Sequence, residues 1–225
     1  MQLLKPGFNF ENFDSEALLH KIEEAGRVCY QSASGAGSTN TFISNIIKRG
    51  HESVLEHEKI TAGVICDRGV THEIVRHRLA SYSQESTRYC NYSGGVAFII
   101  PPWVAAQPGR YPIDWVGLHG DPRCCPDALL KPENSAAAVW FWNMAVAERD
   151  YLKLLKRGWS PQEARSVLPN SLKTEIVMTM NIREWRHFFK LRTAPAAHPQ
   201  MREVACPMLT VLQKRLPVLF EDIKI

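Results

Sequence analysis

The order of the helical and strand patterns along these 225 residues limits the choice of fold more than any other feature. Apolar residues at helical spacing predict helices capped by Asp14 or Ser15, by Thr39 or Asn40, and by Asp67. Residues 58–66 and 172–180 are rich in β-branched or apolar side chains and predict strands. Three later helical patterns cover about 133–157, 181–192 and 199–216. Because helices and strands do not alternate regularly, we predict an α+β fold with an antiparallel or mixed sheet flanked by several helices, not a parallel doubly wound sheet.

The remaining segments are predicted to be connections within one domain. The chain length favours a single domain that spans residues 1–225. Residues 32–38 are rich in glycine and serine, and residues 79–95 are polar, so we expect loops at both places. Seven prolines fall between residues 101 and 134. A connection of that length is unusual inside a compact domain, so we expect an irregular surface excursion at about 103–134.

Composition and the cysteines exclude several classes of protein. With 45% hydrophobic residues, 22% charged residues and a net charge of +4, the chain is not of the disordered class. The first residues lack the apolar core of a signal peptide, and two prolines interrupt the most apolar run, at 96–106, which predicts a cytoplasmic protein that does not enter a membrane. The six cysteines form no CxxC pair, and Cys124 and Cys125 have no further ligands nearby. We therefore predict free thiols and no metal site.

The densest group of chemically capable side chains lies between residues 76 and 88. Arg76, His77 and Arg78 are consecutive. Successive helical residues differ in direction by about 100°, so the two arginines are expected to project different ways. Ser86 and Arg88 follow and suit a phosphate. The alternative is a helix end neutralised by basic side chains, but the downstream serine and arginine favour an anion site.

A second group, Gly-His-Glu-Ser-Val-Leu-Glu-His, covers residues 50–57. His51 and His57 are six residues apart, which does not place them on one face of a helix. A zinc hydrolase built on His51, Glu56 and His57 is therefore a minor alternative.

A third group follows the second predicted strand. If a helix begins at Asn181, Arg183 and His187 share one face, and Arg192 lies near the helix end. One face could then hold a cofactor and the end a substrate. The range 149–192 has 10 basic and 4 acidic residues, so a nucleic-acid-binding module is a further alternative. Its aromatic residues form no recognisable stacking motif, which argues against that alternative.

Taken in this order, the three groups resemble the flavin-dependent thymidylate synthases. The signature of that family, Arg-His-Arg-x-x-Ser-x-x-x-x-Ser-x-Arg, is matched in full by Arg76, His77, Arg78, Ser81, Ser86 and Arg88. The Gly-His-Glu-Ser segment, Glu-Ala-Arg-x-x-Leu-Pro from Glu163, the Asn-x-Arg pair and Ala-His-Pro-Gln-Met-Arg-Glu-Val-Ala from Ala197 are also similar to the family. The resemblance covers about residues 10–220.

The resemblance implies a thymidylate synthase that converts dUMP to dTMP by reductive methylation. It implies FAD as the cofactor, methylenetetrahydrofolate as the carbon donor and NADPH as the reductant. It also implies a homotetramer whose active sites are assembled between subunits. The expected partners are therefore small molecules and further copies of the chain, and neither nucleic acid nor membrane.

The resemblance also implies roles for individual residues. Arg192 matches the arginine held to bind the pyrimidine and to favour ionisation of its ring nitrogen 3, and is the predicted catalytic residue. The other positions expected to contact dUMP are Glu73, Arg76, Gln84, Glu85, Ser86, Thr87, Arg88 and Arg165. The positions expected to contact FAD are His51, Ser53, Glu56, Arg76, His77, Arg78, Asn181, Arg183 and His187.

These side chains suit the chemistry of uracil. Carbon 5 of uracil is a poor nucleophile until electron density moves into the ring, and a guanidinium near nitrogen 3 favours the anionic ring electrostatically. No cysteine nucleophile is then required, so Cys90 is given no role. Ser86 has no base within obvious reach in the sequence, and we expect it to bind the nucleotide and not to attack it.

Overall fold

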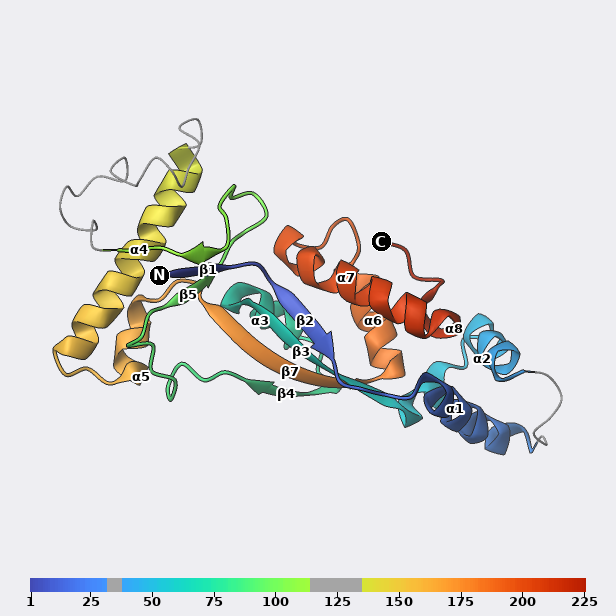
Figure 1. Cartoon of the computed structure of the whole chain (residues 1–225). Coiled ribbons are helices and arrows are strands. Elements are labelled where there is room, and N and C mark those ends of the chain that lie inside the picture. The colour runs from blue at the N-terminus through green and yellow to red at the C-terminus, as the bar shows by residue number, and fades with distance from the viewer. Residues whose placement is uncertain (32–37, 114–134) are drawn as a thin grey trace. The chain divides into compact units, whose positions relative to one another are not determined.

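The computed structural model describes residues 1–31, 38–113 and 135–225 of the chain (Figure 1). Two compact units can be distinguished. Unit 1 consists of residues 1–7, 65–72 and 84–176, and unit 2 of residues 8–64, 73–83 and 177–225. Most of the glycine- and serine-rich segment, together with Cys124 and Cys125, lies outside the described residues. That the whole chain is one domain stays a prediction.

Unit 1 contains a mixed three-stranded sheet, which confirms the expected sheet type. Strand β1 (Gln2–Leu4) pairs in parallel with β5 (Ala97–Ile99) and antiparallel with β6 (Gly109–Arg110). The long helix α4 (Ser135–Lys156), the short helix α5 (Pro161–Ala164) and the 3-10 helix η4 (Arg165–Val167) follow. Strand β6 lies inside the segment predicted to be irregular, because pairing with β1 gives those two residues an extended conformation.

One face of α4 forms the core of unit 1. Its Phe141 and Tyr151 are fully buried in the same cluster as Leu3 of β1 and Phe98 of β5. Buried positions recur at helical spacing along α4, as an amphipathic helix requires. Each such large side chain contributes roughly 1.5–3 kcal/mol when it leaves water, so this face attaches α4 to the sheet.

A four-stranded sheet, in the order β2-β3-β7-β4, supplies most of the strand residues of unit 2. Its strands are β2 (Gly7–Phe10), β3 (Lys59–Asp67), β7 (Lys173–Asn181) and β4 (Ala80–Gln84). Alternate residues of β3 and β7 are buried, among them Ile60, Val64 and Met178. On β3 and β7, the hydroxyls of Thr61 and Thr179 share a 2.9 Å hydrogen bond.

The helices of unit 2 form a second layer around an aromatic core. They are α1 (Ser15–Tyr30), α2 (Thr39–Lys48), the 3-10 helix η1 (Glu52–His57), α6 (Ile182–Arg192), α7 (Pro199–Arg215) and α8 (Pro217–Phe220). Trp185, Phe188 and Phe189 of α6 are fully buried and in mutual ring contact. The indole nitrogen of Trp185 donates to the Ile60 carbonyl oxygen at 3.0 Å, which ties α6 to β3.

The α+β class and the main helices are confirmed, but two local predictions were wrong. Helix α3 (Arg68–Ile74) ends four residues before the predicted Arg78, and β4 occupies part of the segment predicted to be a polar loop. Strand β4 forms because its edge is paired: just beyond it, the Glu85 N–H donates to the Glu175 carbonyl at 2.8 Å. Among the residues that the structure describes, none of the helices is both long and apolar enough to cross a bilayer.

Candidate functional site

The turn after α3 presents the three basic residues of the signature. Arg76 and Arg78 are exposed, whereas His77 between them is only 3% exposed. The Tyr82 hydroxyl, on β4, donates to the carbonyl oxygens of Ile74 at 2.9 Å and of His77 at 2.7 Å. This contact ends α3 early and makes the two arginines project to solvent on either side of a buried histidine.

His77 joins two charged side chains of α6. Its Nδ1 lies 3.0 Å from Glu184 Oε1, and its Nε2 accepts a hydrogen bond from Arg192 Nε at 3.0 Å. Two aromatic rings border the imidazole, that of Phe188 at 5.0 Å and that of His187 at 5.4 Å between centroids. Burial lowers the pKa of His77 below its usual value, the Glu184 hydrogen bond acts in the opposite direction, and the Arg192 charge lowers it further. His77 is therefore neutral at physiological pH.

The guanidinium of Arg192 is held on two sides. Besides the bond to His77, its Nη1 donates to Glu73 Oε2 at 2.8 Å and its Nη2 donates to the Glu73 carbonyl oxygen at 3.0 Å. A guanidinium carries five N–H groups, so two of them have no partner among the residues that the structure describes. The side chain of Arg192 is 15% exposed. This geometry presents a partly desolvated, oriented cation to a planar ligand.

A pocket of about 620 Å³ in unit 2 contains two of the positions expected to contact flavin, Glu56 and Asn181. Ser81 of the signature, Leu79 and Met180 also line it. The volume falls in the range usual for ligand sites. At Glu56, the carboxylate accepts from Arg183 Nη1 at 2.6 Å.

Three further predicted flavin positions lie at η1 and on α6. His51 and Ser53 are exposed at the start of η1, and His187 is exposed on α6, one turn after Arg183. Asn181 is the N-cap of α6, because its side-chain oxygen accepts from the Glu184 N–H at 2.8 Å. Asn181 therefore has a structural role, since it begins the helix.

A second group of predicted residues lies in unit 1, in the segment after β4. Arg165 donates from Nη1 to the Thr87 hydroxyl at 2.9 Å, which joins η4 to this segment. The Ser86 hydroxyl accepts from the Arg88 N–H at 3.3 Å, and Arg88 is exposed over the ring of Tyr89. This segment thus carries Arg88 and the hydroxyls of Ser86 and Thr87, and Arg165 contacts it; these are residue types that can bind a phosphate.

Glu85 and Gln84 are held from within unit 1. The Glu85 carboxylate accepts from the Tyr92 hydroxyl at 2.7 Å and from Lys173 Nζ at 3.0 Å. Burial alone would lower the pKa of Lys173, but hydrogen bonds to Glu175 and Glu85 hold it above its usual value. The Gln84 amide nitrogen lies within hydrogen-bonding distance of two threonine hydroxyls, those of Thr71 at 3.1 Å and Thr174 at 3.2 Å. Both side chains are therefore fixed before any ligand arrives.

The predicted residues thus form two clusters, one in each unit. Four supporting residues were not predicted: Tyr82, Tyr92, Lys173 and Glu184. The alternating pattern around Tyr82 was a usable signal for a strand. Nothing local in the sequence singles out Glu184, because a glutamate in the first turn of a helix is ordinary.

Six of the ten basic residues in the range 149–192 form ion pairs within their own unit. Arg149 is paired with Asp150, Arg183 with Glu56, and Arg192 with Glu73. Arg186 is 1% exposed and is paired with Asp222 at 2.7 Å. These pairs do not form the continuous exposed basic track that a nucleic acid requires.

The metal alternative at His51, Glu56 and His57 also finds no support in the geometry. A grouping with ligand-like distances does occur, but it consists of His77, Glu184 and His187. Both ring nitrogens of His77 are already engaged, and the Arg192 guanidinium beside it repels a metal cation. We interpret this grouping as a hydrogen-bonded network.

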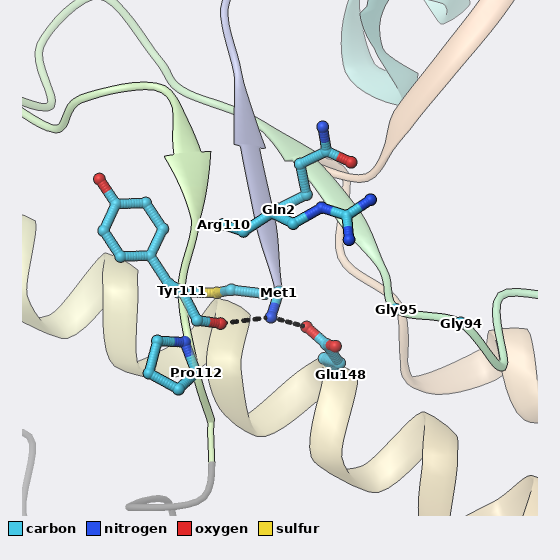
Figure 2. Close-up of a pocket in the computed structure, with 8 residues that line it drawn as sticks. All are labelled: Met1, Gln2, Gly94, Gly95, Arg110, Tyr111, Pro112 and Glu148. Atoms are coloured by element: carbon cyan, nitrogen blue, oxygen red, sulfur yellow. Dashed lines mark hydrogen bonds and ion pairs between the residues drawn. The ribbon is translucent and has the colours of Figure 1, made fainter.

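A pocket of about 370 Å³ in unit 1 contains none of the predicted site residues. Figure 2 shows its lining: Met1, Gln2, Gly94, Gly95, Arg110, Tyr111, Pro112 and Glu148. The Met1 nitrogen donates to the Tyr111 carbonyl oxygen at 2.7 Å and lies 2.8 Å from a Glu148 carboxylate oxygen. The charges of Met1 and Glu148 thus pair within the pocket, and no residue of either cluster lines it.

Comparison with known proteins identifies the family. The family model described as thymidylate synthase complementing protein matches residues 15–218. A flavin-dependent thymidylate synthase of Geobacter sulfurreducens is 33% identical over 208 residues, which are 88% of this chain and 78% of that protein. The chain belongs to the flavin-dependent thymidylate synthase family. A member from Mycobacterium avium is 35% identical over 213 residues, 91% of this chain and 79% of that protein.

A solved structure extends the family likeness to the fold. The UMP/dUMP methylase PolB from Streptomyces cacaoi, bound with 5-Br UMP, superposes with a TM-score of 0.72 at 26% identity. The match covers 98% of this chain and 94% of that one. The family resemblance predicted from the Arg-His-Arg signature is therefore confirmed.

Proposed function

We propose that this family member is a thymidylate synthase that converts dUMP to dTMP, with FAD as cofactor, methylenetetrahydrofolate as carbon donor and NADPH as reductant. The observation that carries the proposal is the state of Arg192. It is an oriented guanidinium with two N–H groups left to donate, close to the signature turn. A planar ring such as uracil offers matching acceptors in its carbonyl oxygens and, once it is ionised, in its ring nitrogen 3.

In this proposal, the nucleotide phosphate binds to exposed cations of the signature. In unit 1, Arg88 supplies charge, Arg165 is already directed to the segment by Thr87, and the Ser86 hydroxyl adds a donor. The Arg192 charge then stabilises negative charge on the uracil ring, which raises the electron density at carbon 5. The protein thereby activates the pyrimidine without a covalent nucleophile.

The donor set of the unit 2 pocket is consistent with FAD. A flavin dinucleotide combines a polar heterocycle with a dianionic pyrophosphate, and the pocket combines hydrogen-bonding side chains with neighbouring cations. Ser81, Asn181 and Glu56 would contact its polar groups, and Arg78 and Arg183 would offset its charge. His51, Ser53, His77 and His187 are further candidate contacts. When bound, the flavin supplies the redox and carbon-transfer chemistry, and the protein orients and polarises the substrates.

We also propose a homotetramer with active sites assembled between subunits. Leu79, next to Arg78, is 70% exposed, and a subunit contact would remove this apolar side chain from water. Light scattering of the purified protein tests the assembly, and a monomer that is active would exclude it.

The test of the proposed function compares Arg192→Ala with Arg149→Ala, which removes an arginine from a surface ion pair. Wild-type protein should purify with a flavin absorption band, and the reduced flavin should be reoxidised, with dTMP formed, on addition of dUMP and methylenetetrahydrofolate. Arg192→Ala should retain the flavin and lose dTMP formation by at least about 100-fold, as expected when an oriented electrostatic contact is lost. Arg149→Ala should behave as wild type.

Two outcomes would contradict the proposal. If the protein gains no flavin when FAD is supplied, FAD is not its cofactor. If the Arg192→Ala variant has full activity, Arg192 does not have the role assigned to it. UMP serves as a parallel substrate, because the solved relative is a UMP/dUMP methylase. If the protein prefers UMP to dUMP, the main product would be methylated UMP and not dTMP.

A further inference from the structure

Glu184 is a carboxylate in the first turn of α6, where helix formation favours its charge but does not explain its burial. It is 7% exposed, and its backbone N–H already donates to the Asn181 cap. That cap needs only the N–H of residue 184 and is indifferent to its side chain. Burying a carboxylate is costly unless it is paired or hydrogen-bonded. The described partner of Glu184 is His77, at 3.0 Å.

The direction of the hydrogen bonds around His77 follows from the chemistry of arginine. Arg192 Nε can donate but cannot accept, so the Nε2 atom of His77, 3.0 Å away, must be the acceptor. The single proton of the neutral imidazole is then on Nδ1, and Glu184 accepts it. With the proton on Nε2, two donors would face each other, and the Nδ1 lone pair would face a carboxylate. The chain of donation therefore runs from Arg192 to His77 to Glu184.

We propose that Glu184 is a positioning residue for Arg192, acting through the tautomer of His77. The inference rests on the proposed function, in which Arg192 contacts the pyrimidine. Glu184 keeps Nε2 of His77 free of its proton, so that this atom holds the Arg192 Nε–H. Glu73 holds the guanidinium from the other side. The two remaining N–H groups then have a fixed direction.

The other groups around His77 cannot replace Glu184. The Phe188 ring restricts rotation of the imidazole but offers no acceptor. His187 lies beside the ring at 5.4 Å between centroids, with no hydrogen bond to it. The Tyr82 hydroxyl donates to the main-chain oxygen of His77 and does not reach its ring. Glu184 is thus the acidic group that sets the tautomer.

The first test measures dUMP binding to the FAD-loaded protein by isothermal titration calorimetry. Glu184→Ala leaves the Nδ1 proton without an acceptor, and the productive tautomer is then only partly populated. The dissociation constant of dUMP should rise about five- to tenfold, because apparent affinity falls with the fraction of competent protein. Glu184→Gln should stay within about twofold, since its amide oxygen accepts the same proton.

The matched control is Glu23→Ala. Glu23 is also 7% exposed in unit 2, and its carboxylate bonds Arg27 and Thr39, away from His77. The control should lose stability as Glu184→Ala does while binding dUMP as wild type does. Equal weakening by both variants, or unchanged affinity in Glu184→Ala, would overturn the positioning role.

The second test reads the tautomer directly and needs no nucleotide. In protein labelled with ¹⁵N-histidine, His77 should show a protonated Nδ1 and an unprotonated Nε2 through the neutral pH range. A His77→Asn variant assigns the signal among the eight histidines of the chain. A proton on Nε2 in the wild type would refute the proposal even if no Glu184 variant folds. Failure of wild-type protein to bind dUMP, with the expected tautomer present, would instead refute the proposed function.

Discussion

Removing one hydroxyl, in Tyr82→Phe, tests whether the signature turn is held from β4. The hydroxyl is half-buried and donates to two carbonyl oxygens, those of Ile74 and His77, at 2.9 and 2.7 Å. Burial raises the pKa of Tyr82 to about 12, so the phenol is a donor at any physiological pH. A net hydrogen bond contributes about 0.5–1.5 kcal/mol, and a buried acceptor left without a partner costs more. We expect a loss of about 1–2 kcal/mol in the free energy of unfolding.

The assay is urea-induced unfolding followed by circular dichroism, with protein and FAD concentrations held constant because bound ligand adds apparent stability. Tyr89→Phe is the matched control: it is the same chemical change at a side chain that is 77% exposed. The control should change the unfolding free energy by less than about 0.5 kcal/mol.

Tyr82→Phe should also weaken dUMP binding, because the turn that carries Arg76 and His77 loses its main-chain anchor. If both tyrosine variants have the same stability as wild type, the hydroxyl does not hold the turn, and the explanation given for the early end of α3 is wrong. A loss of stability without any change in dUMP affinity would show that the Tyr82 hydroxyl stabilises the fold but does not affect nucleotide binding.

Two further predictions concern charged groups. Asp222→Ala leaves the guanidinium of Arg186, 1% exposed, without its main carboxylate. It should cost about 2–4 kcal/mol in urea unfolding, whereas Glu221→Ala next to it should cost less than about 0.5 kcal/mol. Because the folded-state pKa of His77 is lowered, the unfolded chain binds more protons below about pH 6.5, and stability should fall as the pH drops through that value. In Arg192→Ala the pKa of His77 should rise and the pH dependence of unfolding should shrink. An unchanged pH dependence of unfolding in this variant would show that the Arg192 charge does not lower the pKa of His77.

The basic residues of the chain illustrate how far composition can be interpreted. The excess at residues 149–192 made a nucleic-acid-binding module an alternative. In the structure, Arg186 is a buried member of an ion pair, and Lys173 is held between two glutamates. Arg76 and Arg88, which lie outside that range, are exposed. The charge count alone did not distinguish paired from exposed basic residues. Whether a basic side chain is paired depends on which acidic side chain the fold places beside it, and a count contains no such information.

The sequence alone determined the elements whose signals are local. Helix α1 begins at its Asp14 cap, and α6 at Asn181, because a cap depends only on residues two or three positions away. The Arg-His-Arg signature indicated the family for a similar reason, since its six positions lie within thirteen residues. Short strands such as β1 and β5 were missed, because three residues are too few to show a period of two.

Only the tertiary structure decided what the signature residues contact. His77 meets Glu184 across 107 positions of sequence, and Arg192 meets Glu73 across 119. Such contacts depend on how α3, β4 and α6 pack, and no periodicity or cap in the sequence encodes the partner. Packing also turned three consecutive basic residues into two exposed cations and one buried, neutral imidazole. The residue types indicated which chemistry was available, and the long-range contacts decided which side chain holds the proton and which is left to bind the ligand.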